Sequence, residues 1–366
     1  MNDSAATPAA DPSAPAVVVI GTGLIGASVG RALTGVGVSV HLRDSKLSHA
    51  RVAATVGAGT IEPPIRSEVG LVVIAVPPRA IADVVAQALR TYPNATVTDV
   101  GSVKAGVLDA LWDSDVALER YVGSHPMAGS QHSGPVTARA DLFQDRIWVI
   151  TPHRRSAPAS VERVTALVES CGALAVVMDV DDHDSAVARV SHLPHLMSVL
   201  MAGHLTTVPD QHLLLAGQGL RDVTRIAASD PVLWEQIVGA NSAAVLPELR
   251  SVQDQLSLII KAIEAVPAAE ELRAQLNRGL QGTRKIPGKH GAAPMTYSQV
   301  VIEIPDAPGA LARLFTDVGA AGVNVEDISI EHDQIRQVGY LSLSVTPEEA
   351  PALVAAMTEH GWDLQP

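Results

Sequence analysis

The sequence predicts an α/β protein with more than one domain. Its 366 residues exceed what a single hydrophobic core normally supports. Only 3% of the residues are aromatic, while Ala, Val, Leu and Gly are abundant, which is typical of helices packed on a parallel sheet. Short β-branched runs alternate with helical patterns in the first half of the chain. We therefore expect a doubly wound parallel sheet followed by further domains.

Charge and cysteine content exclude several classes of protein. The formal net charge is -13, and nucleic-acid backbones are bound mainly through clustered Lys and Arg, so no nucleic-acid partner is expected. Cys171 is the only cysteine, so the chain forms neither an intramolecular disulfide nor a thiolate metal cluster. Residues 1–16 predict a disordered tail rather than a secretory signal, and no apolar run reaches the roughly 20 residues of a spanning helix. We expect a cytoplasmic enzyme that does not bind membranes.

The first strand, turn and helix carry a dinucleotide-binding pattern. A β-branched run over residues 16–20 is followed by Gly21-Thr-Gly-Leu-Ile-Gly26 and a helical pattern. Gly21 permits the tight turn, Gly23 lets the backbone approach a pyrophosphate, and Gly26 lets the helix pack against the strand. The free amides of the helix N-terminus would bind that pyrophosphate. Cofactor contacts are expected from Gly21, Gly23, Leu24, Ile25 and Gly26.

The second strand, residues 38–44, ends in a carboxylate. Asp44 stands where a Rossmann carboxylate accepts hydrogen bonds from the adenosine ribose, and its charge would repel the extra phosphate of NADP. Arg43 would instead favour a phosphate, although a solvated surface arginine explains it equally well. We therefore expect NAD as the cofactor.

The later strands complete a Rossmann-type domain over residues 17–180. The buried run 71–78 contains Val76 and Pro77 at its end, where ligands bind such sheets, so both are expected to contact the cofactor. Further strands are predicted over residues 95–100, 147–150 and 173–178.

Two more domains are predicted after residue 180. Apolar residues recur every three or four positions through residues 181–282, which predicts an all-helical domain for dimerisation and substrate binding. Asp230-Pro231 predicts a helix start. Residues 283–295 are basic and rich in Gly and Pro, as in a linker. Residues 296–366 follow a β-α-β-β-α-β order, which predicts a ferredoxin-like module whose last helix opens with a capping box at residues 346–349.

Three polar clusters carry candidate catalytic groups. Ser102 and Lys104 follow one strand, His125 lies in the Gly-rich stretch 123–134, and the third cluster combines residues 191–195 with residues 219–227. A histidine, with an unperturbed pKa of about 6.5, accepts a hydroxyl proton while hydride leaves the same carbon. An arginine matches a carboxylate with two parallel hydrogen bonds. Together these groups predict a dehydrogenase for an anionic alcohol.

Four of these segments, in this order, resemble prephenate dehydrogenase: Gly101-Ser-Val-Lys104, Ser124-His-Pro-Met-Ala-Gly129, Ser191-His-Leu-Pro-His195 and Asp222-Val-Thr-Arg-Ile-Ala227. Asp306-Ala-Pro-Gly-Ala-Leu311 and Gly322-Val-Asn324 resemble an ACT domain. The two resemblances cover nearly all of the chain from Ala16. They imply NAD-dependent oxidative decarboxylation of prephenate to 4-hydroxyphenylpyruvate in tyrosine biosynthesis.

The resemblance also implies roles for single residues. His125 would hydrogen-bond and deprotonate the ring hydroxyl, Ser102 would orient that hydroxyl or His125, and Arg225 would bind a substrate carboxylate. The substrate-binding residues would also include His192, His195, Ser130 and Gln131. Many bacterial members carry Glu at the position of Gln131, so the ionic network or gating assigned to that Glu loses its charge here.

The ACT-like end implies regulation of a homodimer. Such modules usually pair and bind amino acids between them, here near Asp306, Gly309 and Asn324, with tyrosine as the expected effector. Alternatively, the module only stabilises the dimer.

The residues leave several alternatives open. His192 and His195 would suit a metal pair, but no third ligand has a recognisable spacing, so no metal is expected. Arg225 would pair with Asp222, or form an ordinary surface pair with Arg221. Lys104 would contact the substrate or cofactor, or only follow its turn. His132, His153, His183 and His204 receive no role.

Two other functions compete with this interpretation. Arogenate dehydrogenase uses the same ring chemistry on a substrate with an amino-acid side chain. A catalytically silent regulator that binds NAD and amino acids would keep the fold without turnover. The combination of His125, Ser102 and Arg225 argues against the regulator, which needs no base beside a carboxylate clamp.

Overall fold

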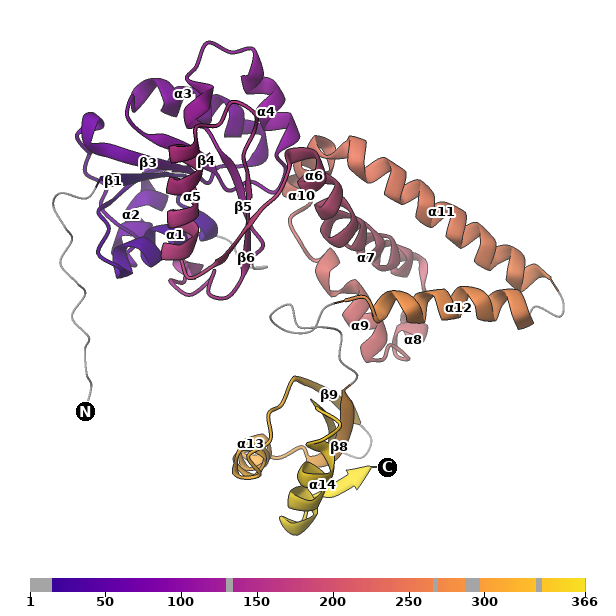
Figure 1. Cartoon of the computed structure of the whole chain (residues 1–366). Helices are drawn as coiled ribbons and strands as arrows, with labels where there is room; N and C mark the ends of the chain where they lie inside the picture. Colours follow the sequence, from indigo (N-terminus) through magenta and orange to yellow (C-terminus); the bar gives the residue numbers. More distant parts are fainter. Residues whose placement is uncertain (1–14, 130–133, 266–268, 287–296, 334–337, 366) are drawn as a thin grey trace. The chain divides into compact units, whose positions relative to one another are not determined.

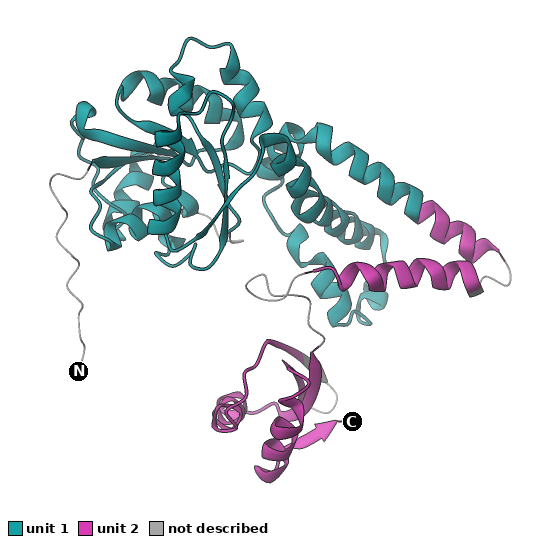
Figure 2. Ribbon diagram, in the orientation of Figure 1, with its two compact units in different colours: residues 1–255 teal, residues 256–366 magenta. Residues whose placement is uncertain are grey.

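The computed structural model describes residues 15–129, 134–265, 269–286, 297–333 and 338–365 (Figure 1). The chain divides into two compact units, residues 1–255 and 256–366 (Figure 2). The division falls inside one long helix, α11 (Ser242–Glu264). The domain boundaries expected at residues 180, 282 and 295 therefore stay predictions.

The first unit is built on a parallel sheet with the order β2-β1-β3-β4. Its strands are β1 (Ala16–Ile20), β2 (Val40–Arg43), β3 (Val69–Ile74) and β4 (Thr96–Asp99). A second sheet has the order β5-β6-β7, with β5 (Gly123–Pro126), β6 (Ile147–Thr151) and β7 (Leu174–Val177). A parallel bridge between Val97 and Tyr121 places the start of β5 beside β4. The predicted Rossmann-like α/β domain is thereby confirmed.

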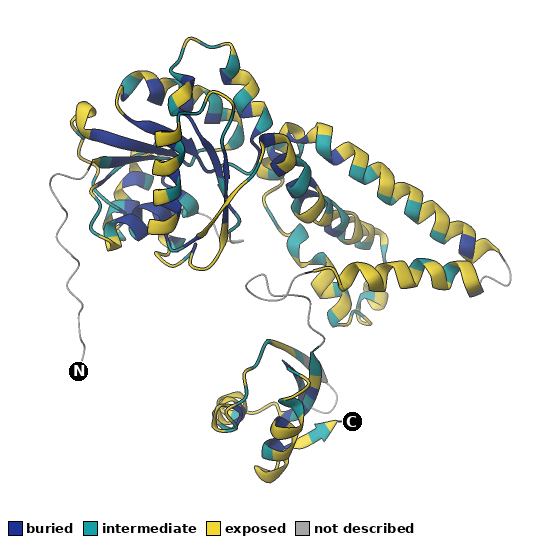
Figure 3. Cartoon of the chain, in the orientation of Figure 1, coloured by how far each residue is buried: buried dark blue, intermediate teal, exposed yellow. Residues whose placement is uncertain are grey.

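Helices cover both faces of this sheet. Val17 and Val19 of β1 belong to one buried cluster, together with residues of α1 and α5, whereas Val18 belongs to the opposite cluster, with residues of α3 and α4. This division follows from the alternation of side chains along a strand. Buried residues, dark blue in Figure 3, accordingly concentrate on these strands. The helices are α1 (Leu24–Gly35), α2 (Leu47–Thr55), α3 (Ile81–Thr91), α4 (Ala105–Trp112) and α5 (Pro158–Ser170).

The chain becomes helical at α6 (Val180–Val187), as predicted. A π-helical turn over Ala188–His192 then leads into α7 (Leu193–His204). Pro194 accounts for this irregularity, since proline has no N–H to donate and its ring crowds the preceding turn. The remaining helices of this unit are α8 (Asp210–Leu213), α9 (Gln218–Thr224) and α10 (Pro231–Ala240), followed by the start of α11. Asp230 caps α10 as predicted, because its Oδ1 accepts a 2.9 Å hydrogen bond from the Val232 amide.

The second unit contains an antiparallel sheet with the order β11-β8-β10-β9. Its elements after α12 (Ala269–Thr283) are β8 (Ser298–Pro305), α13 (Ala310–Ala320), β9 (Asp327–Asp333), β10 (Val338–Val345), α14 (Ala350–Glu359) and β11 (Asp363–Gln365). The predicted β-α-β-β-α-β order is confirmed. Alternate residues of β8, namely Val300, Ile302 and Ile304, are buried in the core of the module.

The predicted capping box at the start of α14 is only half formed, because the Glu349 carboxylate accepts a hydrogen bond from the Thr346 backbone but the helix begins after Glu349. The Thr346 hydroxyl donates to the Glu349 carboxylate itself at 2.6 Å, and Glu349 becomes the N-cap without a side-chain bond to the helix. The Glu349 carboxylate also accepts a hydrogen bond from the backbone amide of Asn324 at 3.3 Å.

Within the described part of the chain, no helix is long and apolar enough to cross a membrane.

Candidate active site

The carboxyl edge of the first sheet gathers the predicted cofactor and catalytic residues. Gly21 follows β1, Asp44 follows β2 and Val76 lies two residues beyond β3. Ser102 follows β4, and His125 lies in β5, which starts parallel to β4. Because parallel strands present their carboxyl ends at one edge, these segments meet where open α/β sheets bind ligands.

The glycine loop has the geometry that a dinucleotide requires. Gly21 has a φ of +93°, and a Cβ there would lie 2.3 Å from the Ala75 carbonyl oxygen. A Cβ on Gly26 would lie 1.9 Å from the Gly21 oxygen. Gly23, by contrast, faces open space, and it caps α1 without any side-chain hydrogen bond. The first amides of α1 are thus left for an anion such as a pyrophosphate.

We expect Gly26→Ala to destabilise the fold and Gly23→Ala to spare it. The Gly26 methyl would overlap backbone, and such overpacking costs about 1–3 kcal/mol, whereas the methyl of Gly23→Ala meets no atom within 4 Å. Gly23→Ala should still weaken NAD+ binding, because it lines the pyrophosphate position. Thermal unfolding and calorimetric NAD+ titration measure both effects; equal melting temperatures for the two variants would contradict this account of the loop.

Asp44 is already held by the loop beside it. Its Oδ2 accepts hydrogen bonds from the Thr22 amide at 2.8 Å and the Thr22 hydroxyl at 2.9 Å, and its Oδ1 accepts one from the Lys46 amide at 2.8 Å. Partial burial acts to raise the pKa of Asp44, but these hydrogen bonds outweigh it and lower the pKa. A fixed carboxylate therefore stands where an adenosine ribose would bind.

Arg43 is engaged by the protein itself. Its guanidinium donates to the carbonyls of Leu42 at 2.7 Å, Ile61 at 3.0 Å and Glu62 at 3.2 Å. Both alternatives from the sequence, a phosphate ligand and a solvated surface arginine, left out these bonds to the main chain, which occupy the guanidinium. The other predicted cofactor contacts, Leu24, Ile25 and Val76, are half-buried, and Pro77 is exposed.

His125 lies at the end of a hydrogen-bonded chain. Its Nδ1 is 2.9 Å from Nε2 of His183, and Nδ1 of His183 is 2.7 Å from Oδ1 of Asp184. The same carboxylate accepts hydrogen bonds from the backbone amides of Lys104 at 2.9 Å and Ala105 at 2.8 Å. Asp184 thereby ties α6 to the N-terminus of α4, and these bonds hold its pKa low although burial opposes them.

The surroundings keep His125 neutral. Burial lowers its pKa well below the usual 6.5, and the nearby His183, Lys104 and His192 lower it further. A neutral imidazole accepts a proton, whereas an imidazolium does not. The site therefore favours the form of His125 that can accept a proton.

The Lys104 side chain is buried and bonded within the protein. Its side chain is 1% exposed, and its Nζ pairs with Asp99 and donates to the Ser124 carbonyl at 2.9 Å. The Tyr121 hydroxyl donates to the same Asp99 carboxylate at 2.8 Å. Of the two roles left open by the sequence, these contacts favour the one in which Lys104 supports the turn beneath His125.

His192 and His195 share an aromatic neighbour, Trp234. The His195 ring stacks on Trp234 with centroids 3.4 Å apart, and the His192 ring meets it edge-on at 6.1 Å. Asn241 donates from Nδ2 to the Asp184 carbonyl at 2.8 Å and contacts Nδ1 of His192 at 3.1 Å. Since an amide nitrogen donates, His192 accepts at Nδ1 and carries its proton on Nε2. Burial lowers the pKa of His192 to about 4, so this donor is uncharged.

Arg225 and Ser102 remain available to a ligand. Arg225 is exposed in the short turn after α9 and has no ion pair among the described residues. Asp222, its expected alternative partner, instead accepts a 2.7 Å hydrogen bond from Gln218. Ser102 is half-buried beyond β4. Ser130 and Gln131 lie outside the described residues.

The sequence interpretation missed four members of this site: His183, Asp184, Trp234 and Asn241. His183 was assigned no role, although it contacts His125 directly. The motif Asp182-His183-Asp184 was the available signal, since a carboxylate beside a histidine often fixes its tautomer. Nothing local in the sequence pointed to Asn241 or Trp234.

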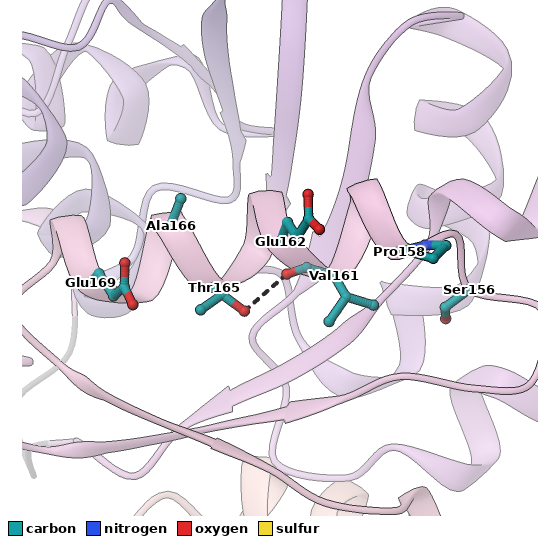
Figure 4. Close-up of a pocket in the computed structure, with 7 residues that line it drawn as sticks. All are labelled: Ser156, Pro158, Val161, Glu162, Thr165, Ala166 and Glu169. Atoms are coloured by element: carbon teal, nitrogen blue, oxygen red, sulfur yellow. Dashed lines mark hydrogen bonds between the residues drawn. The ribbon is translucent and has the colours of Figure 1, made fainter.

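A hollow lies along α5, lined by none of these residues (Figure 4). It is lined by Glu162 and Glu169, and none of the seven lining residues is cationic. Like charges would repel both a dinucleotide and a carboxylate substrate. The described residues also include no group of three potential metal ligands.

Comparisons with known proteins show which family the chain resembles. The family model for the prephenate dehydrogenase nucleotide-binding domain matches residues 29–177, and the model for the prephenate dehydrogenase dimerization domain matches residues 179–278. Probable prephenate dehydrogenase NovF of Streptomyces niveus is 34% identical over 355 residues, covering 94% of this chain and 98% of NovF.

Two solved structures resemble the chain over about three quarters of its length. Prephenate dehydrogenase from A. aeolicus, in complex with hydroxyphenyl propionate and NAD+, is 25% identical with a TM-score of 0.67, covering 74% of this chain and 97% of that one. Synechocystis arogenate dehydrogenase is 26% identical with a TM-score of 0.63, covering 74% and 99%.

Proposed function

Because the chain belongs to the prephenate dehydrogenase family, we propose that it converts prephenate to 4-hydroxyphenylpyruvate, using NAD, in tyrosine biosynthesis. The chain is an NAD-dependent dehydrogenase. The observation that carries the assignment of the base is the position of His125 at the same sheet edge as the glycine loop, where burial lowers its pKa. The rate of NADH formation with prephenate tests the proposal.

When bound, NAD+ supplies the acceptor for the hydride on the ring carbon that bears the hydroxyl. His125 takes the hydroxyl proton as the C–H bond breaks, and the oxygen becomes a carbonyl. The ring carboxylate leaves as CO2, and the electron pair of its broken C–C bond enters the ring. His125 then returns the proton to the same oxygen, which becomes a phenol, so that no net proton is released.

Other polar groups would orient the dianionic substrate. Arg225 provides a fixed cation with a planar fork for a carboxylate. His192 offers an uncharged N–H, which would donate to a substrate oxygen. Ser102 would orient the ring hydroxyl, and His195, Ser130 and Gln131 complete the proposed substrate contacts.

The pH dependence should reflect the depressed pKa of His125. Activity requires neutral His125, so kcat/KM should hold as pH falls through the usual imidazole range and decline only below pH 6.5. The profile should be recorded in buffers of constant ionic strength, with protein stability checked at each pH. An acid limb with its midpoint above 6.5 would contradict the environment described for His125.

Arogenate is the alternative substrate, because an arogenate dehydrogenase is among the structures that resemble this chain. The proposed contacts of His125 and Ser102 address the ring, which both substrates share. Comparing the two substrates at equal concentration distinguishes these possibilities.

We also propose a homodimer built through residues 179–278. Exposed apolar side chains in the first unit support such an interface: Val190, Leu200, Leu214, Leu215 and Leu246. Sedimentation at micromolar concentration should give twice the mass of the chain, and a monomer would contradict the proposal.

The C-terminal module is proposed to be an ACT domain that binds tyrosine. Its sheet order supports this, and two candidate segments flank α13: Asp306 and Gly309 before it, and Asn324 after it. Gly309 adopts a φ of +89°, and Asn324 contacts Glu326 and Glu349. Tyrosine would regulate turnover only if it binds one state of the enzyme better than another.

A further inference from the structure

We propose that His183 and Asp184 are positioning residues that hold His125 in the tautomer protonated at Nδ1, which leaves Nε2 as the base. The inference rests on the proposed role of His125. It assigns the reactive nitrogen and adds two residues to the mechanism. Neither residue needs to touch the substrate for this effect.

The chain of reasoning begins at Asp184. Its carboxylate accepts hydrogen bonds from the backbone amides of Lys104 and Ala105. A backbone N–H can only donate a hydrogen bond, so the carboxylate must be the acceptor in both. These contacts keep the carboxylate ionised, and an ionised carboxylate has no proton to give. In the hydrogen bond between Oδ1 of Asp184 and Nδ1 of His183, the proton must therefore be on Nδ1 of His183.

The proton position on His183 determines the one on His125. With its single proton on Nδ1, His183 has a lone pair on Nε2, which is the atom 2.9 Å from Nδ1 of His125. His125 must then donate from Nδ1. Its second nitrogen, Nε2, keeps its lone pair and can accept the hydroxyl proton.

The surroundings protect this arrangement. The His183 side chain is fully buried, so water does not compete for its nitrogens. The rings of His125 and His183 meet at 75°, with centroids 5.1 Å apart. Other charged or titratable groups around the pair are Lys104 and Asp99 beneath β5 and His192 on the π-helical turn.

The tautomer can be read directly by nitrogen NMR. In the full-length protein with 15N-labelled histidine, long-range proton–nitrogen spectra show which ring nitrogen carries the proton, and the spectrum of His125→Asn assigns the His125 signals. We expect His125 to carry its proton on Nδ1. A proton on Nε2 of His125 in the unsubstituted protein would overturn the proposal.

A matched pair of variants tests the consequence for turnover. His183→Phe keeps an aromatic ring but removes the acceptor, and should lower kcat by about 10- to 100-fold, as loss of a group that orients a functional histidine typically does. His183→Gln places an acceptor oxygen near the position of Nε2 and should recover most of kcat. The KM for substrate and the NAD+ affinity should change little in both.

These readouts separate positioning from mere packing. Equal losses in His183→Phe and His183→Gln, at equal melting temperatures, would contradict the proposal, as would an unchanged kcat in His183→Phe. His153→Asn is the control, because His153 is a half-buried histidine whose ring nitrogens contact the main chain of Tyr121 and Arg155. If His125→Asn retains turnover, the proposed base is wrong, while the NMR result still decides the tautomer.

Discussion

Replacing His125 by Asn should lower kcat by about 10²- to 10⁴-fold, the usual contribution of a positioned general base. Asn keeps a polar group near Nδ1 and so preserves the contact with His183, but it has no nitrogen that accepts the hydroxyl proton. The glycine loop proposed to bind NAD+ is untouched. Steady-state rates with prephenate and calorimetric NAD+ binding should therefore show lost turnover with nearly unchanged cofactor affinity.

The His153→Asn variant is the control for this measurement as well, since it removes an imidazole that contacts the main chain of residues 121 and 155. Its kcat should stay close to that of the unsubstituted enzyme. Comparable turnover in His125→Asn would remove His125 from the chemistry, and equal losses in both variants would point to a general structural effect.

Replacing Arg225 by Ala should raise the KM for the anionic substrate by about 10- to 100-fold, because a hydrogen bond to a charged group contributes about 1.5–3 kcal/mol. Arg225 is exposed and has no ion pair with the described residues, so its removal leaves no buried carboxylate unpaired. The fold should be unaffected. Initial rates over a range of substrate concentrations separate KM from kcat.

Arg221 supplies the control, because it lies four residues earlier on α9 and is also exposed. Arg221→Ala should change KM little, whereas Arg225→Lys should recover only part of the loss, since an ammonium lacks the planar fork. An unchanged KM in Arg225→Ala would refute the carboxylate clamp.

The geometry of the glycine loop and of Asp44 was predictable because its determinants are local. The turn after β1 needs Gly21 at a positive φ, and Gly26 must lack a side chain for α1 to pack against that turn. Asp44 follows directly from the end of the next strand, and the structure adds that Thr22 and Lys46 hold its carboxylate. Such requirements leave a signature within a few residues.

The catalytic half was only partly predictable, because it depends on residues far apart in the chain. His183 reaches His125 across 58 positions, and Asn241 reaches His192 across 49. Lys104 looked like a candidate ligand, yet its long side chain is buried against Asp99. The burial of the Lys104 side chain follows from how β4, β5 and α6 pack together. No local pattern in the sequence predicts it.

The assay that tests the central claim most directly is the initial rate of nicotinamide reduction by the purified full-length protein. Prephenate and arogenate should each be supplied with NAD+ and with NADP+, without tyrosine. We expect turnover of prephenate with NAD+, and much slower turnover with NADP+ because of the charge of Asp44. No turnover of either substrate with either cofactor would contradict the proposed function and favour a protein that binds NAD without catalysing this reaction.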